Sequence, residues 1–234
     1  MKQILLPVLI ALCTSACVPN DGGSSEMKLE TQQIDLGRAE SVKATIEMPA
    51  GNFELRGGAA KLLEGEYRFS SEALRPVLDY RVSGGVGELK LSVEHKVNVG
   101  SAQARWETRL NDKVPLDLEL RLGAGKAEAL AGSLNLRRLE VNYGAGEFTL
   151  DLRGNTQSSY DAEIRGGVGL SRIYLPGDAG VEAEAHKGIG SISTQGDIRH
   201  DGSRYYNALW GKASKQVRLR IHGGIGTIKL IAED

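Results

Sequence analysis

Five side chains between residues 197 and 205 could do acid–base or metal chemistry. They are Asp197, His200, Asp201, Arg204 and Tyr205. Carboxylates, an imidazole and a phenol this close together could transfer protons or hold a cation. Asp, Gly, Ser and His clustered between strands are, however, typical of a solvated turn. We therefore assign no catalytic residue here, and a polysaccharide-active enzyme is the least favoured alternative.

The remaining motifs point away from cofactors. The four histidines, His95, His186, His200 and His222, are not spaced as a helical ligand pair. Several Gly-x-Gly pairs occur, but none has the third glycine of a dinucleotide site or the aspartate of a calcium-binding repeat. Cys13 and Cys17 are the only cysteines, so a thiolate metal site beyond residue 17 is excluded. We expect no metal, no cofactor and no enzymatic activity.

The first 16 residues have the composition of a secretion signal. Lys2 is basic, residues 4–12 are apolar but too few to span a bilayer, and residues 14–16 are small. Small residues before a cysteine resemble the lipobox of bacterial lipoproteins, whose cysteine becomes the lipidated first residue. This resemblance implies lipidation of Cys17, with residues 17–30 as a flexible tether. The alternative is an ordinary signal peptide with Cys17 as an incidental thiol.

The charges of the chain are balanced and interspersed. The net charge is −1 at pH 7, and both signs alternate throughout the sequence. A nucleic-acid partner would favour a basic excess on one face, so we exclude nucleic acid. Residues 31–234 contain no further linker-like stretch and suit one domain.

A Gly-x-Gly pair recurs along this domain, with shorter steps of about 22 residues between copies. A fixed period in this range is typical of stacked repeats. Glycine suits a sharp corner because it reaches backbone angles closed to other residues. The predicted corner glycines are Gly85, Gly87, Gly123, Gly125, Gly144, Gly146, Gly167, Gly169, Gly188, Gly190, Gly224 and Gly226.

Apolar residues alternate on both sides of each pair, and the phase slips by three residues across it. The slip predicts a corner whose middle residue points inward. One inward column would be Ala124, Ala145, Val168 and Ile189, and the next Ala127, Phe148, Ser171 and Ile192. The fold class predicted is all-β, a single-stranded right-handed parallel β-helix (β-solenoid). An antiparallel β-sandwich is the alternative.

Two longer steps contain excursions, at residues 94–113 and 197–212, each with one tryptophan. Aromatic residues on excursions either cover a core end or form a binding surface. The residues of a possible binding surface are Trp106, His200, Arg204, Tyr205 and Trp210.

The stretch from Gly166 to Leu230 resembles the toast-rack domain of cell-wall-active-antibiotic response proteins, related to bacterial putative-adhesin β-helices. The matching points are Leu175-Pro176, Asp178, Gly180-Val181, Gly188 to Ile192, Tyr206-Asn207 and Gly223 to Gly226. The resemblance implies a β-helical envelope domain, active in envelope-stress responses in some relatives, and it transfers no catalytic residue.

Together these features predict a non-enzymatic, lipid-anchored protein of the bacterial cell envelope. Its expected task is binding or scaffolding, with an envelope protein or glycan as partner. An adhesin or glycan-binding surface lipoprotein is the alternative. Val18 after Cys17 resembles the sorting pattern for the outer membrane, facing the periplasm. The sequence does not indicate an oligomeric state.

Overall fold

The computed structural model describes residues 27–94 and 102–232, which form β-strands and one short 3-10 helix. The elements are β1 (Lys28–Ile34), β2 (Ser41–Arg56), β3 (Leu63–Phe69), η1 (Glu72–Leu74), β4 (Pro76–Ser83), β5 (Val86–Val93), β6 (Ala104–Leu110), β7 (Leu116–Leu130), β8 (Leu136–Asp151), β9 (Tyr160–Tyr174), β10 (Gly180–Gln195), β11 (Ile198–Asp201), β12 (Arg204–Asn207) and β13 (Gln216–Ile231). β1 thus begins inside the segment expected to be a tether. In the described part of the chain, no helix has the length and apolarity needed to cross a membrane.

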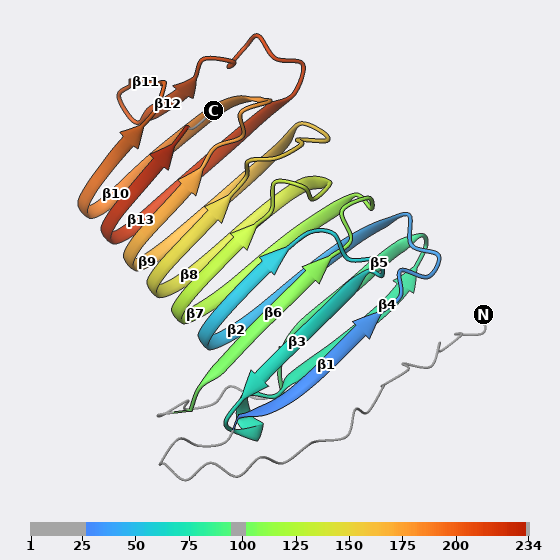
Figure 1. Cartoon of the computed structure of the whole chain (residues 1–234). Coiled ribbons are helices and arrows are strands. Elements are labelled where there is room, and N and C mark those ends of the chain that lie inside the picture. Colours follow the sequence, from blue (N-terminus) through green and yellow to red (C-terminus); the bar gives the residue numbers. More distant parts are fainter. Residues whose placement is uncertain (1–26, 95–101, 233–234) are drawn as a thin grey trace.

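Six long strands, β2, β7, β8, β9, β13 and β10, stack in parallel and fold back on themselves (Figure 1). The halves before the bends form one wall, here called the first-half sheet, and the halves after the bends form the second-half sheet. Each winding hydrogen-bonds to the next along both walls. The all-β, mostly parallel β-solenoid predicted from the repeat is therefore present, and the antiparallel sandwich is wrong for this stack.

The windings do not follow chain order at the C-terminal end. β13 lies between β9 and β10, as the pairing of Ile225 with Val168 on one side and with Ile189 on the other shows. The chain leaves one strand position open after β9, forms β10 and the β11–β12 hairpin, and returns to fill the gap. The expected neighbours Val168 and Ile189 are thus separated by a strand.

Both ends of the stack are antiparallel. At the N-terminal end, β5 and β4 extend the first-half sheet, while β6, β3 and β1 extend the second-half sheet. At the other end, β12 and β11 extend the first-half sheet beside β10. Antiparallel strands therefore cover the edges of both walls at the N-terminal end, but only that of the first-half sheet at the other end, where the second half of β10 pairs with β13 alone.

The glycine pairs from Gly123 to Gly226 align in register across neighbouring strands. The second glycine of each pair needs the absence of a side chain. At Gly169, φ is +138°, and an added Cβ would lie 1.9 Å from the carbonyl oxygen of Gly146. The pair Gly85 and Gly87 was wrongly predicted as a corner. Gly84 and Gly85 form the two-residue turn of the β4–β5 hairpin, because Ser83 pairs directly with Val86.

The middle residue of each corner points outward, so the first predicted inward column is wrong. Val168, Ile225 and Ile189 are 51%, 52% and 71% exposed, and Ala124 and Ala145 are exposed as well. In β7, Leu122 is the last buried residue before the bend and Ala127 the first after it. The four residues between them lie on the outside of the bend, and the inward phase restarts only after the glycine with positive φ.

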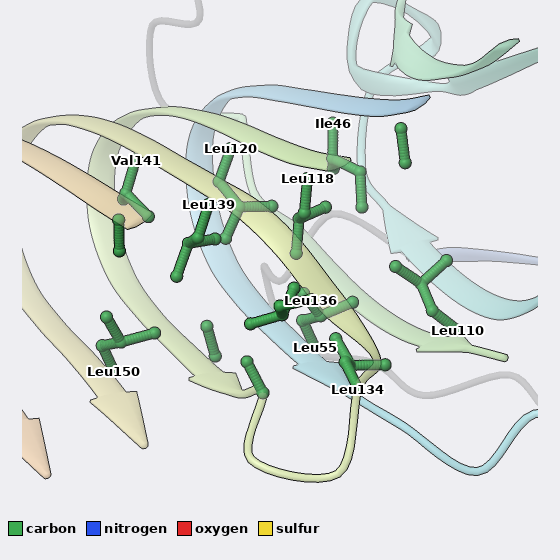
Figure 2. Packing of buried hydrophobic residues seen from close by; sticks show 14 of the residues in the cluster. Ile46, Leu55, Leu110, Leu118, Leu120, Leu134, Leu136, Leu139, Val141 and Leu150 are labelled. Atoms are coloured by element: carbon green, nitrogen blue, oxygen red, sulfur yellow. The ribbon is translucent and has the colours of Figure 1, made fainter. Parts of the chain in front are cut away.

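The second predicted column does face the core. Ala127, Phe148 and Ser171 are buried, and Ile192 is half-buried on the last winding. The two walls enclose a single apolar cluster in which leucines of neighbouring windings stack along the axis, as Leu118 and Leu139 do (Figure 2). Burying an aliphatic side chain of this kind contributes about 1.5–3 kcal/mol, so each winding is stabilised by the next.

Candidate binding surface

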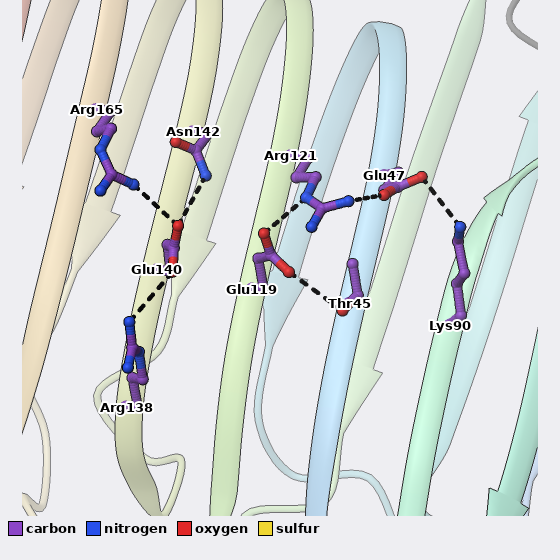
Figure 3. Close-up of polar contacts among 9 residues, drawn as sticks. All are labelled: Thr45, Glu47, Lys90, Glu119, Arg121, Arg138, Glu140, Asn142 and Arg165. Carbon is purple, nitrogen blue, oxygen red and sulfur yellow. Dashed lines mark hydrogen bonds and ion pairs between the residues drawn. The ribbon is translucent and has the colours of Figure 1, made fainter.

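The outer side of the first-half sheet carries a ladder of charged residues. From β5 to β9, carboxylates of the same or the neighbouring strand pair with Lys90, Arg121, Arg138 and Arg165 (Figure 3). Arg165 lies 2.9 Å from Glu140, and Lys90 lies 3.5 Å from Glu47. Burial alone would raise the pKa of Glu140, but hydrogen bonds from Asn142 and Arg165 outweigh it and lower that pKa.

The ladder changes character at the C-terminal end. Every arginine from Arg56 to Arg172 forms an ion pair. The four arginines that follow Arg172 in the sequence form no ion pair with residues of the described ranges. These arginines are Arg199, Arg204, Arg218 and Arg220. All four are exposed on the outer side of β11, β12 and β13.

Two aromatic rings lie among these arginines. The ring of Tyr206 is centred 6.3 Å from that of Trp210, with the planes tilted by 36°. The guanidinium of Arg218 lies over the Trp210 ring, 5.7 Å from its centre, within the range of a cation–π contact. Both rings are half-buried and keep part of their surface in solvent. We call Arg199, Arg204, Arg218, Arg220, Tyr206 and Trp210 the arginine–aromatic surface.

Pairing across the strands explains why these side chains share one face. Glu182 of β10 pairs with Arg218 on β13 and with Tyr206 on β12, and Tyr206 pairs with Arg199 on β11. Paired residues point to the same side of a sheet. The Tyr206 side chain, followed by the charges of Glu182 and Glu184, raises the pKa of Arg204.

The predicted binding residues separate onto two faces. Tyr205 pairs with Ala183, a buried residue, and with His200, so these two side chains face the core end rather than the outer side. Their rings are 5.8 Å apart. Arg204 points the other way, together with its pair Asp201. The acid–base cluster considered from the sequence therefore does not converge on one site.

Trp106 was wrongly predicted as part of a binding surface. It is 0% exposed and packs edge to face against Tyr67, with ring centres 5.5 Å apart. The excursion that carries it contains β6, a strand paired with both β2 and β3. The other excursion supplies the β11–β12 hairpin and Trp210.

Two further sequence expectations bear on ligands. No group of three or more potential metal-ligating residues occurs within 27–94 and 102–232. Cys17, the predicted lipidation site, lies outside the described residues. Reasoning from the sequence missed Arg218, Arg220 and Tyr206 as residues of a binding surface. The alternation of Arg218 and Arg220 with Val217, Leu219 and Ile221 was the available signal, since it places both arginines on the outer face.

A solved structure shares this architecture. A structure from Clostridium sporogenes, named a putative cell adhesion protein, matches with a TM-score of 0.83 and 29% sequence identity, over 89% of this chain and 100% of that one. A structure from Bacteroides fragilis, named a putative adhesin, matches over 88% of this chain and 98% of that one. That match has 13% sequence identity and a TM-score of 0.28. No curated protein matches the chain.

A family model described as the N-terminal domain of toast_rack, DUF2154, matches residues 23–174. This match covers well over half of the chain and lies mostly upstream of the stretch that carried the resemblance. The chain therefore belongs to the toast-rack family.

Proposed function

We propose that this chain is a non-enzymatic binding protein of the bacterial cell envelope. The observation that carries the proposal is its likeness to the Clostridium sporogenes structure, which it covers completely and whose name states a putative role in cell adhesion. A scaffold that holds a partner needs fixed surface groups rather than a reacting centre. The separation of His200 and Tyr205 from Asp201 and Arg204 supports binding over catalysis.

The geometry of the stack suits a binding scaffold. Its strands are about 4.8 Å apart, so outward side chains stand in rows of fixed spacing along the axis. Such rows match a ligand that is itself extended and repetitive. We expect the windings to be right-handed, since parallel crossover connections are right-handed in about 98% of cases.

We further propose that a lipid on Cys17 holds the protein at the outer membrane, with the domain facing the periplasm. The sequence of residues 1–17 supports this part of the proposal. Acyl chains contribute about 0.8 kcal/mol of membrane affinity per buried methylene. β1 and β11 lie at opposite ends of the stack (Figure 1), so an anchor before β1 would direct the arginine–aromatic surface away from the membrane. A role in an envelope-stress response stays a prediction of the family resemblance.

Binding without turnover tests the proposal. The purified full chain is incubated with polysaccharide extracted from bacterial envelopes, and the polymer is then sized by chromatography. We expect the polysaccharide to be retained on the immobilised protein with an unchanged size distribution. Shortening of the polymer would show an enzyme instead, and the absence of retention would contradict a glycan-binding role.

A further inference from the structure

We propose that the arginine–aromatic surface binds a glycan in which acidic groups, carboxylate or phosphate, alternate with neutral sugars. This inference rests on the proposed binding function and names its site and its class of ligand. The surface runs over β13, β10, β12 and β11 on the outer side of the first-half sheet. Four strands span about 14 Å, which suits a short stretch of an extended chain.

The arginines supply the recognition of the acid. A planar guanidinium binds carboxylate and phosphate with two parallel hydrogen bonds. The ion pairs of Arg121 and Arg165 engage these donors elsewhere on the same face, whereas Arg199, Arg204 and Arg218 form no ion pair with described residues. Single exposed cations without an ion pair also occur elsewhere among the described residues, as at Arg38 and Lys43, but here four such guanidinium groups gather on neighbouring strands. The surface therefore concentrates donor capacity that ion pairs do not occupy.

The two rings supply the recognition of the sugar. The side chains of Trp210 and Tyr206 are half-buried, so each ring is partly packed against the protein and partly exposed to solvent. Aromatic side chains of this kind combine a large apolar area with little conformational freedom to lose on binding. Arg218 fixes the Trp210 ring from one side through its cation–π contact. An apolar ring face beside exposed guanidinium groups without ion pairs fits an acidic sugar better than a simple anion.

The carboxylates on the same face select against a uniform polyanion. Glu182 and Glu184 lie between the rows of arginines, and Asp201 pairs with Arg204. A ligand with a charge at every unit, such as nucleic acid, would be repelled by these groups. Sugar hydroxyls instead donate hydrogen bonds to carboxylates. The mixture of guanidinium donors and carboxylate acceptors on one face thus indicates acid groups spaced by neutral sugars.

Titration calorimetry of the full chain tests the proposal with four probes. They are a hyaluronan decasaccharide, the same oligosaccharide with its carboxyls reduced, a poly(glucosylglycerol phosphate) chain, in which a neutral sugar separates neighbouring phosphates, and duplex DNA. We expect binding of hyaluronan or of the phosphate polymer, and the preferred one identifies the acid. The reduced oligosaccharide should bind at least tenfold more weakly than hyaluronan. Fluorescence should change through Trp210, because Trp106 is fully buried.

Matched variants locate the site. Arg204→Ala and Arg218→Ala should each weaken binding about tenfold, the loss of one charge-assisted contact. Arg121→Ala, on the same face but paired with Glu47 and Glu119, should leave binding unchanged. Circular dichroism checks that all three variants remain folded. Equal losses of affinity in all three variants would show that the arginine–aromatic surface is not the binding site, although the protein would still be a binding protein. Binding of no probe, equal binding of the reduced oligosaccharide, or tighter binding of DNA would overturn the ligand class.

Discussion

The hydroxyl of Tyr143 on β8 forms a hydrogen bond with the hydroxyl of Ser171 on β9. Ser171 is 2% exposed, and its position in an apolar column had no explanation in the sequence. Tyr143 reaches it by lying across Gly166, where an added Cβ would be 2.0 Å from the tyrosine oxygen. The same ring stacks on Phe148 at 4.9 Å. Glycine, tyrosine and serine at these three positions therefore form one packing unit.

A double-mutant cycle measures this unit. Tyr143→Phe and Ser171→Ala each leave one buried or half-buried hydroxyl without its partner and should each cost about 1 kcal/mol in the free energy of unfolding. The double variant should cost about 1 kcal/mol less than the sum. Urea unfolding gives the values. Tyr143→Phe combined with Ser191→Ala, on exposed β10 sequence, should be additive; additivity in both cycles would contradict the contact.

Because the middle residue of each corner points outward, we expect the protein to tolerate a charged substitution there, even though the native residue is apolar. Ile189→Asp should change the free energy of unfolding by less than about 1 kcal/mol, because the side chain is 71% exposed. Ile228→Asp, at 4% exposure on the neighbouring strand, should cost more than about 3 kcal/mol or prevent folding. Thermal melts distinguish the two. Similar losses would place the corner residue inside after all.

Close contact between windings predicts a graded cost of substituting glycine. Gly169→Ala adds a Cβ 1.9 Å from a backbone oxygen at φ +138°, so we expect a loss above about 3 kcal/mol. Gly58→Ala has positive φ, +87°, but open space around the added carbon. It should cost only about 1–2 kcal/mol, the price of the backbone conformation alone. Equal destabilisation in chemical unfolding would rule out crowding between neighbouring corners.

Buried tyrosines predict a loss of stability in alkali. Burial raises the pKa of Tyr67 and of Tyr160 above the ordinary value of 10.0. Above about pH 10 the unfolded chain loses these protons while the folded chain keeps them, so the free energy of unfolding should fall as pH rises. The slope should be about 1.4 kcal/mol per pH unit for each tyrosine. Burial raises the pKa of Tyr80 as well, so Tyr67→Phe should lower the slope without abolishing it, and an unchanged slope would exclude Tyr67 as a source.

Lipidation at Cys17 predicts a clear labelling pattern. In cells fed labelled palmitate, the protein should carry label, and globomycin should cause the precursor to accumulate. Cys17→Ala should abolish labelling, whereas Cys13→Ala should retain it, because Cys13 follows bulky Leu12 and would be removed with the signal. Label on the Cys17→Ala variant would contradict the assignment.

The repeat was predictable because its causes are local. Backbone crowding at Gly146 and Gly169 recurs once per winding, and the alternation around Phe148 and Leu150 marks the buried face. Strand order was not predictable in the same way. The corners at Gly190 and Gly226 have nearly the same sequence, and nothing local states which of them lies beside Gly169.

The errors about individual residues have physical causes too. Val168, Ile189 and Ile225 are apolar, but the outside of a sharp bend gives them no core to enter. Trp106 stands between the charged residues Arg105 and Glu107, an alternation typical of a strand with one buried face. Its position in a long interval between two glycine pairs nevertheless suggested an excursion. The arginine–aromatic surface brings together residues 199–220 from three strands, and the absence of ion pairs there is visible only in three dimensions.

Sedimentation with isolated bacterial envelopes tests most directly whether this chain is a binding protein whose arginine–aromatic surface holds the ligand. The full chain with Cys17→Ala, which removes the lipid contribution, should pellet with envelopes in moderate salt. Adding Arg204→Ala and Arg218→Ala should leave the protein in the supernatant, while adding Arg121→Ala should not. A chain that stays in solution without these changes, or one that pellets equally well with both arginines removed, would contradict the account.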